Sequence, residues 1–204
     1  ANIGDLDGDG VNDLAVGAHL DDAGGNAQGT VHIIFMNTDG SVKSTVEINS
    51  STTNGPTLTN IDRFGFSVAN IGDLDGDGVN DLAVGAPLDD MDENGDAAGA
   101  TDQGAVHIIF MNTDGSVDST VEINDSTTNG PELDNRDYFG GSVANIGDLD
   151  GNGVIDLAVG AWKVDDGAGN NLGAVHILFL HETTKPTVTI TPSSGDCGDT
   201  VNST

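Results

Sequence analysis

Short apolar stretches alternate with clusters of Gly, Asp and Asn along most of the chain. Two of these stretches, DLAVGA and AVHIIF, are nearly continuous apolar runs, which indicates strands that are covered on both faces. We find no heptad pattern and no helical stripe that would compete with strands. The chain is therefore predicted to be all-β. Between residues 63 and 137 we expect four strands, at Phe66–Ile71, Asp81–Ala86, Ala105–Met111 and Val117–Asn124.

The same pattern is written three times. The sequence IGDLDGDGVNDLAVGA, residues 3–18, returns unchanged at 71–86, and it returns at 146–161 with Asn152 and Ile155 as the substitutions. Repeats this regular imply one supersecondary unit stacked on copies of itself. Four antiparallel strands per unit, buried against neighbouring units on both faces, describe a blade of a β-propeller.

The net charge of the chain disfavours some classes of binding partner. Its 204 residues include 34 acidic and 5 basic side chains, which gives a formal net charge of -29. Such a field repels phosphate backbones and anionic membranes, so we expect no nucleic-acid partner and instead expect cations. No run approaches the roughly 18 to 20 apolar residues of a membrane span, so we expect no membrane insertion in this segment. Solubility or adaptation to salt would account for scattered acidic residues, but it accounts poorly for clustered ones.

The clustered carboxylates suggest metal chemistry. In DLDGDGVND of the second unit, loop positions 1, 3, 5 and 9 are Asp73, Asp75, Asp77 and Asp81. Odd spacing in a tightly curled loop lets alternate side chains converge, and the glycines supply the positive φ angles. With the carbonyl of Val79 at position 7 and water, these groups would satisfy the six to eight oxygens of Ca²⁺. Without a cation the carboxylates repel by about 1 kcal/mol or more per pair, so we expect a poorly ordered metal-free loop.

Two other interpretations of this loop compete with a calcium site. An EF-hand needs a bidentate Glu at position 12 and an exiting helix, whereas position 12 here is Val84, inside DLAVGA. The loop is thus predicted to close at position 9 and to continue into a strand. The second interpretation, that the Asp residues only cap turns, stays open, although three copies with matched spacing disfavour it.

At this point the chain resembles a known family. RFGFSVANIGDLDGDGVNDLAVGAP, residues 63–87, and YFGGSVANIGDLDGNGVIDLAVGAW, residues 138–162, resemble FG-GAP repeats. These repeats are the blades of integrin α-subunit β-propellers and of many bacterial surface proteins. Residues 64–65 and 139–140 match the FG half, and residues 85–87 match the GAP half.

The resemblance extends over about residues 1–181 and implies up to three Ca²⁺ sites, one in each repeat. Carried over residue by residue, the implied ligands are Asp5, Asp7, Asp9, the Val11 carbonyl and Asp13; Asp73, Asp75, Asp77, the Val79 carbonyl and Asp81; and Asp148, Asp150, Asn152, the Val154 carbonyl and Asp156. Some positions depart from the family pattern: the first unit lacks its FG strand, and His19 and Trp162 replace the Pro of GAP. Because Asn152 removes one charge, we expect the third site to bind more weakly than the second.

The repeat boundaries suggest how the chain is organised. We expect FG-GAP repeats over residues 1–181, with a partial blade at 1–62, a blade at 63–137 and a partial blade at 138–181. Since family propellers usually have seven blades, this chain would form an incomplete ring, and further blades would come from chain that is missing here. Residues 182–204 are expected to hold a linker and the start of an immunoglobulin-like β domain, because a Lys-Pro joint is followed by the alternation TVTIT.

Several residues outside the acidic loops are further candidates for a functional role. The histidines of the repeated VHI, among them His107, would lie a blade apart, so we assign them a packing or strand-face role. Trp162 and Tyr138 either face a carbohydrate or, as we favour, pack between blades. The pair Asp89-Asp90 begins the variable loop, where it either adds outer oxygens to the ion or keeps the loop solvated.

No GxSxG, HExxH, P-loop or Rossmann fingerprint occurs, so we do not expect an enzyme. Because Ala1 begins inside a repeat, we expect the chain to be a piece of a longer protein. The function predicted is that of a calcium-binding propeller segment of a secreted or cell-surface protein, which mediates adhesion or binds a protein or glycan ligand. The alternatives are an accessory domain of a secreted hydrolase and a structural spacer.

Overall fold

The computed structural model describes residues 1–89, 102–164, 172–181 and 189–191. All regular elements assigned in these ranges are strands. None of the described residues form a helix that is long and apolar enough to cross a bilayer. The strands are β1 (Asn2–Gly4), β2 (Asp13–Ala18), β3 (Thr30–Met36), β4 (Val42–Ile48), β5 (Ser67–Gly72), β6 (Asp81–Ala86), β7 (Ala105–Met111), β8 (Val117–Ile123), β9 (Phe139–Gly147), β10 (Asp156–Ala161), β11 (Ala174–His181) and β12 (Thr189–Thr191).

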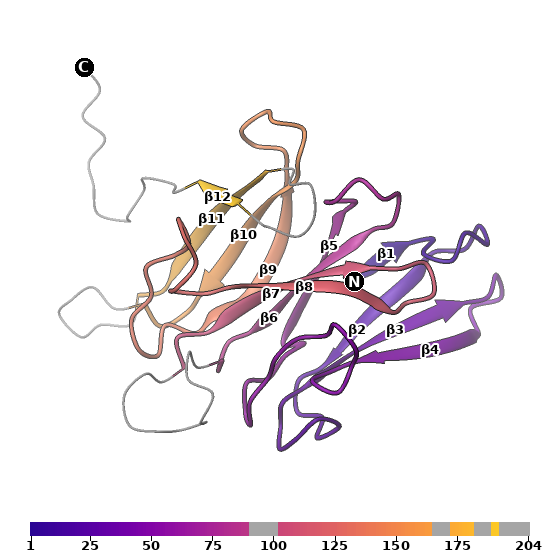
Figure 1. Cartoon of the computed structure of the whole chain (residues 1–204), viewed down its shortest axis with the longest axis horizontal. Helices are drawn as coiled ribbons and strands as arrows, with labels where there is room; N and C mark the ends of the chain where they lie inside the picture. The colour runs from indigo at the N-terminus through magenta and orange to yellow at the C-terminus, as the bar shows by residue number, and fades with distance from the viewer. Residues whose placement is uncertain (90–101, 165–171, 182–188, 192–204) are drawn as a thin grey trace.

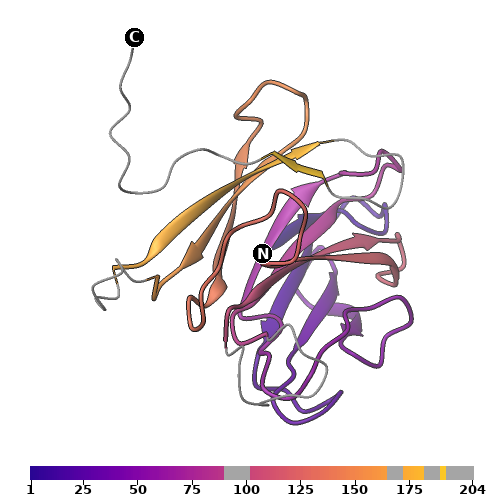
Figure 2. The ribbon, with the colours of Figure 1, turned by 60° about the vertical axis from the view of Figure 1, so that its left-hand side comes forward.

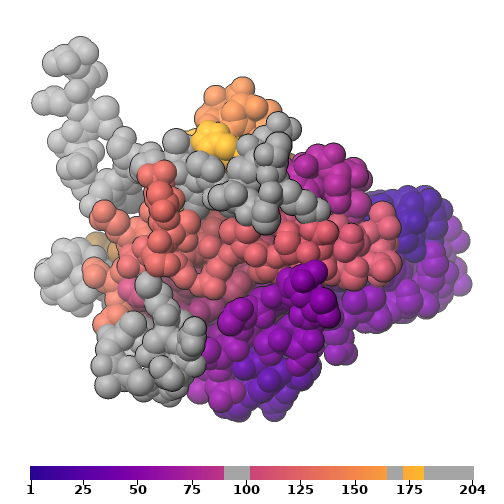
Figure 3. All heavy atoms as spheres, in the orientation of Figure 1, coloured from indigo at the N-terminus to yellow at the C-terminus, as the bar shows by residue number. Residues whose placement is uncertain are grey.

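Each set of four consecutive strands forms one antiparallel sheet, β1 to β4, β5 to β8 and β9 to β12 (Figure 1). The prediction of an all-β fold made of four-stranded blades is confirmed. Figures 1 and 2 show the described sheets as an open arc that does not close into a ring. On the molecular surface, the second unit lies as a band between the indigo and purple first unit and the orange and yellow third unit (Figure 3).

The strands of the second unit lie where the apolar pattern placed them. β6 and β7 coincide with the expected ranges, β5 is shifted by one residue, and β8 ends one residue early at Ile123. Every residue of β6 and of β7 is buried, as expected for strands that are covered on both faces. The cover comes from the neighbouring sheets.

Alternate residues of β7 point to the two neighbouring sheets. Val106, Ile108 and Phe110 belong to the core shared with the third sheet, whereas Ile109 and Met111 belong to the core shared with the first. Successive side chains of a strand point to opposite faces, so one continuous apolar run serves two cores. Burying each such side chain contributes about 1.5–3 kcal/mol.

Glycines of the FG and GAP segments bring neighbouring sheets into backbone contact. A Cβ atom added to Gly85 would lie 1.9 Å from the carbonyl oxygen of Gly140, and one added to Gly17 would lie 1.8 Å from that of Gly65. No side chain fits in so short a distance. The two halves of the repeat pattern are therefore the two sides of one contact between consecutive units.

The third sheet is completed by β12, whose residues Thr189–Thr191 pair with Phe179–His181 of β11. This pairing involves part of the TVTIT segment. Residues 182–188 and 192–204 lie outside the described residues, so the division of the chain at residue 182 stays a prediction.

Candidate metal centre

Each acidic loop joins the first two strands of its sheet. The loops occupy residues 5–12, 73–80 and 148–155, and in each unit the second strand begins at loop position 9 (Figure 1). The exit into β6 at Asp81, rather than into a helix, agrees with the exclusion of an EF-hand.

The carboxylate at position 1 organises the curl of the loop. In the second loop, Asp73 Oδ1 accepts hydrogen bonds from the backbone N–H groups of Gly76 at 2.8 Å and Asp77 at 3.0 Å, and its Oδ2 accepts one from Gly78 at 2.9 Å. Gly76 and Gly78 have φ angles of +79° and +92°, yet a Cβ on either would meet no atom of the described residues within 4 Å. These glycines are needed for their backbone conformation and not for space.

The carboxylate at position 9 ties the loop to the sheet. Asp81 Oδ2 accepts the N–H of Leu74 at 2.8 Å, and its Oδ1 accepts the N–H of Met111 in β7 at 3.0 Å. Burial, with a smaller contribution from the charges of Asp75 and Asp77, raises the pKa of Asp81 to about 7, although the two backbone donors lower it. The same contacts recur in the other units, where Asp13 binds Leu6 and Met36, and Asp156 binds Leu149 and Leu180.

The structure brings together the side chains at positions 1, 3 and 9 in all three loops. One carboxylate oxygen from each residue lies within 4.8 Å of the other two, in the clusters Asp5, Asp7 and Asp13; Asp73, Asp75 and Asp81; and Asp148, Asp150 and Asp156. Hard cations such as Ca²⁺ prefer oxygen ligands in this kind of arrangement.

Positions 5 and 7 are linked by a hydrogen bond in every loop. The side-chain oxygen at position 5 accepts the N–H at position 7, from Val11 to Asp9 at 2.9 Å, from Val79 to Asp77 at 2.8 Å, and from Val154 to Asn152 at 2.7 Å. This bond uses one oxygen of Asp9 and of Asp77 and leaves the second carboxylate oxygen for another ligand.

In the first loop, an ammonium group occupies a cation position. Lys43 Nζ lies 2.7 Å from Asp7 Oδ2 and 2.6 Å from Asp9 Oδ2. The hydrogen bond from Lys43 lowers the pKa of Asp9, and the two carboxylates in turn raise the pKa of Lys43. Since a positive group settles between positions 3 and 5, the donor set fits a cation.

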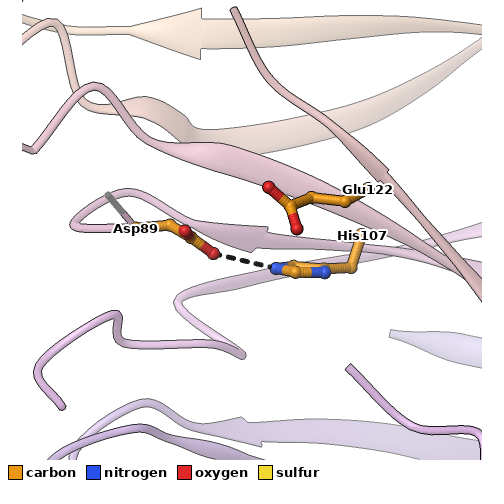
Figure 4. Close-up of side chains that lie close together, drawn as sticks. All are labelled: Asp89, His107 and Glu122. Atoms are coloured by element: carbon orange, nitrogen blue, oxygen red, sulfur yellow. Dashed lines mark hydrogen bonds and ion pairs between the residues drawn. The ribbon is translucent and has the colours of Figure 1, made fainter. Parts of the chain in front are cut away.

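A second cluster, formed by Asp89, His107 and Glu122, was not expected from the sequence (Figure 4). His107 Nε2 lies 3.1 Å from Asp89 Oδ2, and Glu122 pairs with His107 across β7 and β8. Burial raises the pKa of Glu122, as does the charge of Asp89. The repeated VHI and VEI segments were a signal for the cross-strand pair, but nothing in them indicated Asp89.

The buried geometry of His107 agrees with a packing role. Its ring meets the ring of Phe64 edge-on at 5.4 Å. Within the described residues, its buried Nδ1 has no hydrogen-bond partner, which is tolerable for a bare ring acceptor but costly for an N–H. The favoured tautomer therefore carries its proton on Nε2 and donates it to Asp89.

The exposed aromatic residues stack on one another. Trp162 stacks on Tyr138, with 5.0 Å between the ring centroids and an interplanar angle of 1°. It also stacks on Phe66, with 5.6 Å between the centroids and an angle of 27°. Lys163 Nζ lies 4.6 Å from the ring centroid of Tyr138. Because Trp162 is engaged by rings of two units, this geometry favours the packing interpretation over a carbohydrate platform.

Four-stranded antiparallel sheets in series, with glycine contacts between them and an acidic hairpin loop in each, define a repeat protein of the β-propeller class. A family model described as the FG-GAP repeat matches residues 2–34 and 64–109. The chain therefore contains FG-GAP repeats.

Curated relatives include integrin alpha subunits. The chain is 40% identical to integrin alpha pat-2 of Caenorhabditis elegans over 63% of its own length and 9% of the relative. It is 35% identical to integrin alpha-4 of Xenopus laevis over 79% of the chain and 14% of the relative. For human integrin alpha-11 the identity is 35% over 77% of the chain and 12% of the relative. The chain thus spans a small part of the relatives that it matches.

Proposed function

We propose that the chain is a calcium-stabilised β-propeller segment of an extracellular or cell-surface protein and that it serves adhesion without catalysing a reaction. The observation that carries this proposal is the convergence of carboxylates at positions 1, 3 and 9 in each of the three loops. The similarity to integrin alpha subunits supports a role in adhesion. The ligand would be a protein or a glycan, and further blades from outside this chain would extend the arc.

The residues that would hold the ion are those at loop positions 1, 3, 5 and 9, with the carbonyl at position 7. Ca²⁺ would supply the positive charge that offsets their mutual repulsion. Asp81, like Asp13 and Asp156 in the other units, would link the bound ion to the sheet, because its oxygens accept hydrogen bonds from a backbone N–H of the loop and from one of the third strand. The hairpin would then be held rigidly beside its blade.

The metal proposal is tested by thermal unfolding of the 204-residue chain in Ca²⁺ or in chelator. Binding to the folded state alone raises the midpoint as free Ca²⁺ rises, by ligand linkage. Asp77→Ala should blunt this rise, because it removes the position 5 carboxylate of the second loop. Asp114→Ala is a matched control, since Asp114 caps a β7–β8 turn through Ser116 and lies in no acidic loop. A midpoint that is independent of Ca²⁺ in the unsubstituted chain would refute the proposal.

The adhesion proposal needs a separate experiment. An array of extracellular-matrix proteins and glycans, probed with the labelled chain in millimolar Ca²⁺, should show at least one saturable ligand. Binding should fall when Ca²⁺ is chelated, because the loops would lose their order. Absence of saturable binding would instead favour a structural spacer.

A further inference from the structure

Lys43 reaches the first acidic loop from a strand that does not border it. The loop joins β1 to β2, whereas Lys43 lies on β4, at the far edge of the same sheet. Its ammonium group contacts Asp7 Oδ2 at 2.7 Å and Asp9 Oδ2 at 2.6 Å. It therefore bridges loop positions 3 and 5, both of which are proposed metal ligands.

In the acidic loop, and from the second residue of the third strand to the end of the fourth, the second unit differs from the first at a single residue. The loop sequence is identical at residues 3–18 and 71–86, and residues 31–49 and 106–124 differ only in Lys43 against Asp118. The two residues are in register, since each follows a valine that pairs with the last residue of the preceding strand. The first unit thus places a cation where the second places an anion.

The third unit differs from the other two within the loop itself, at position 5. Asn152 replaces the position 5 aspartate, and its amide lies 2.8 Å from the Leu180 carbonyl and 2.9 Å from His181 Nδ1 in β11. One negative charge of the first loop is thus offset by an ammonium group, and the third loop has one carboxylate fewer. The second loop keeps all four carboxylates, and Asp118 stands where the first unit has Lys43.

We propose that Lys43 is a tethered cation that competes with the divalent ion for the first loop, so that the first and second loops differ in calcium affinity although their sequences are identical. This inference rests on the proposed function of the loops. For Asp7 and Asp9 to ligate a divalent ion, the ammonium group must leave or must remain beside a second positive charge. Either outcome weakens binding, whereas Asp118 favours a cation near the second loop.

The same contact should keep the first loop ordered without metal. Two of its carboxylates are already bridged by Lys43 Nζ, so their repulsion is offset within the chain. The Lys43 side chain is 41% exposed, and the flexible four-carbon stem of a lysine allows its ammonium group to swing into solvent when an ion enters. The first loop would thus respond to calcium only at higher concentration, and the second loop would respond first.

The test is a titration of the ¹⁵N-labelled 204-residue chain with CaCl₂, followed by NMR and calorimetry. Gly10 and Gly78 are the reporters, because the N–H of each donates to the position 1 carboxylate of its own loop. In the unsubstituted chain, Gly78 should shift at about tenfold lower Ca²⁺ than Gly10. Lys43→Met should narrow the gap, and Lys43→Asp should remove it.

The reciprocal variant, Asp118→Lys, should weaken the response of Gly78 by about tenfold and leave that of Gly10 unchanged. Lys163→Met is the matched control, since Lys163 stacks on Tyr138 in the third unit and its loss should alter neither reporter. Equal midpoints for Gly10 and Gly78 in the unsubstituted chain, or a midpoint of Gly10 that does not respond to Lys43→Asp, would overturn the inference.

The failure of this inference is distinguishable from failure of the proposed function. If Gly78 responds to Ca²⁺ and Asp73→Asn abolishes the response, the second loop is a calcium site whatever Lys43 does. If neither glycine responds in any variant, the proposed function and the inference both fall.

Discussion

The hexapeptide DLAVGA occurs in β2, β6 and β10 with one sequence and three environments. In β6, between two other sheets, all six residues are buried. In β2, at the open end of the arc, Val16 is 43% exposed, whereas the equivalent Val84 is fully buried. Identical local sequence thus makes the same strand in each unit, but its contribution to stability depends on the neighbouring unit.

The largest effect is expected at the glycine of the GAP segment. Gly85→Ala would drive a Cβ atom into the backbone of Gly140, which cannot move without separating the second and third sheets. We expect a loss of unfolding free energy of about 3 kcal/mol or more, measured by urea denaturation.

Gly160→Ala is the matched control for this contact. Gly160 is the equivalent residue in β10, but the described atom closest to a Cβ there would be the hydroxyl oxygen of Ser142, in its own sheet, at 2.4 Å, and the Ser142 backbone N would lie at an ordinary contact distance of 3.8 Å. That hydroxyl can rotate away, so the loss should be below about 1 kcal/mol. Similar losses for the two variants would contradict the assignment of Gly85 to a contact between blades.

A smaller effect should separate Val84 from Val16. Val84→Ala removes two methyl groups from the core shared with the first sheet and should cost about 2 kcal/mol. Val16→Ala should cost less than about 0.5 kcal/mol, because its side chain is already 43% exposed. Chemical denaturation of both variants checks the difference. If Val16→Ala were equally costly, the open end of the arc would have to be covered in solution.

The comparison also shows what could be predicted from the sequence. The strands of the second unit and the acidic loops followed from local patterns, because apolar runs and Gly-Asp clusters act within a few residues. The contact of Gly85 with Gly140 could not be derived from the pattern, since it depends on how two sheets approach. Lys43 was missed for a related reason: it meets Asp7 only through the pairing of four strands.

The cluster of Asp89, His107 and Glu122 shows the same limit within one blade. His107 and Glu122 lie on the two strands of a hairpin whose register pairs them, while Asp89 joins them from the turn that follows β6. The sequence predicts a solvated or ion-facing position for Asp89, whereas in the structure Asp89 is buried and hydrogen-bonded to the buried His107. When a charged residue lies between a strand and a loop, the local sequence does not show whether its side chain is buried against the sheet or exposed to solvent.

The smallest effect on stability is expected from the first residue of the hexapeptide, whose burial does not differ among the three sheets. Asp13, Asp81 and Asp156 are 1%, 0% and 0% exposed, so each carboxylate is buried whether its sheet lies at the end or in the middle of the arc. In the middle sheet, burial and the charges of Asp75 and Asp77 together raise the pKa of Asp81 to about 7, despite two backbone donors.

This raised pKa predicts a pH dependence of stability for the metal-free chain. Between the unfolded pKa of 3.8 and the folded pKa of about 7, the folded state holds a proton that the unfolded state has lost. Stability from this group is therefore fully present below the lower value and is lost as the pH rises through the higher one. In chelator, the unfolding midpoint should fall by about 2 °C or more between pH 5.5 and pH 7.5.

Asp81→Asn should reduce this pH slope, because the amide keeps one acceptor and does not titrate. Ca²⁺ should reduce it as well, since an ion beside Asp75 and Asp77 would favour the ionised carboxylate. Asp114→Asn, at an exposed turn outside the acidic loops, should leave the slope as it is. A midpoint that rises with pH in chelator would mean that Asp81 is ionised without metal, and that the buried end of the second loop needs no cation to hold its charge.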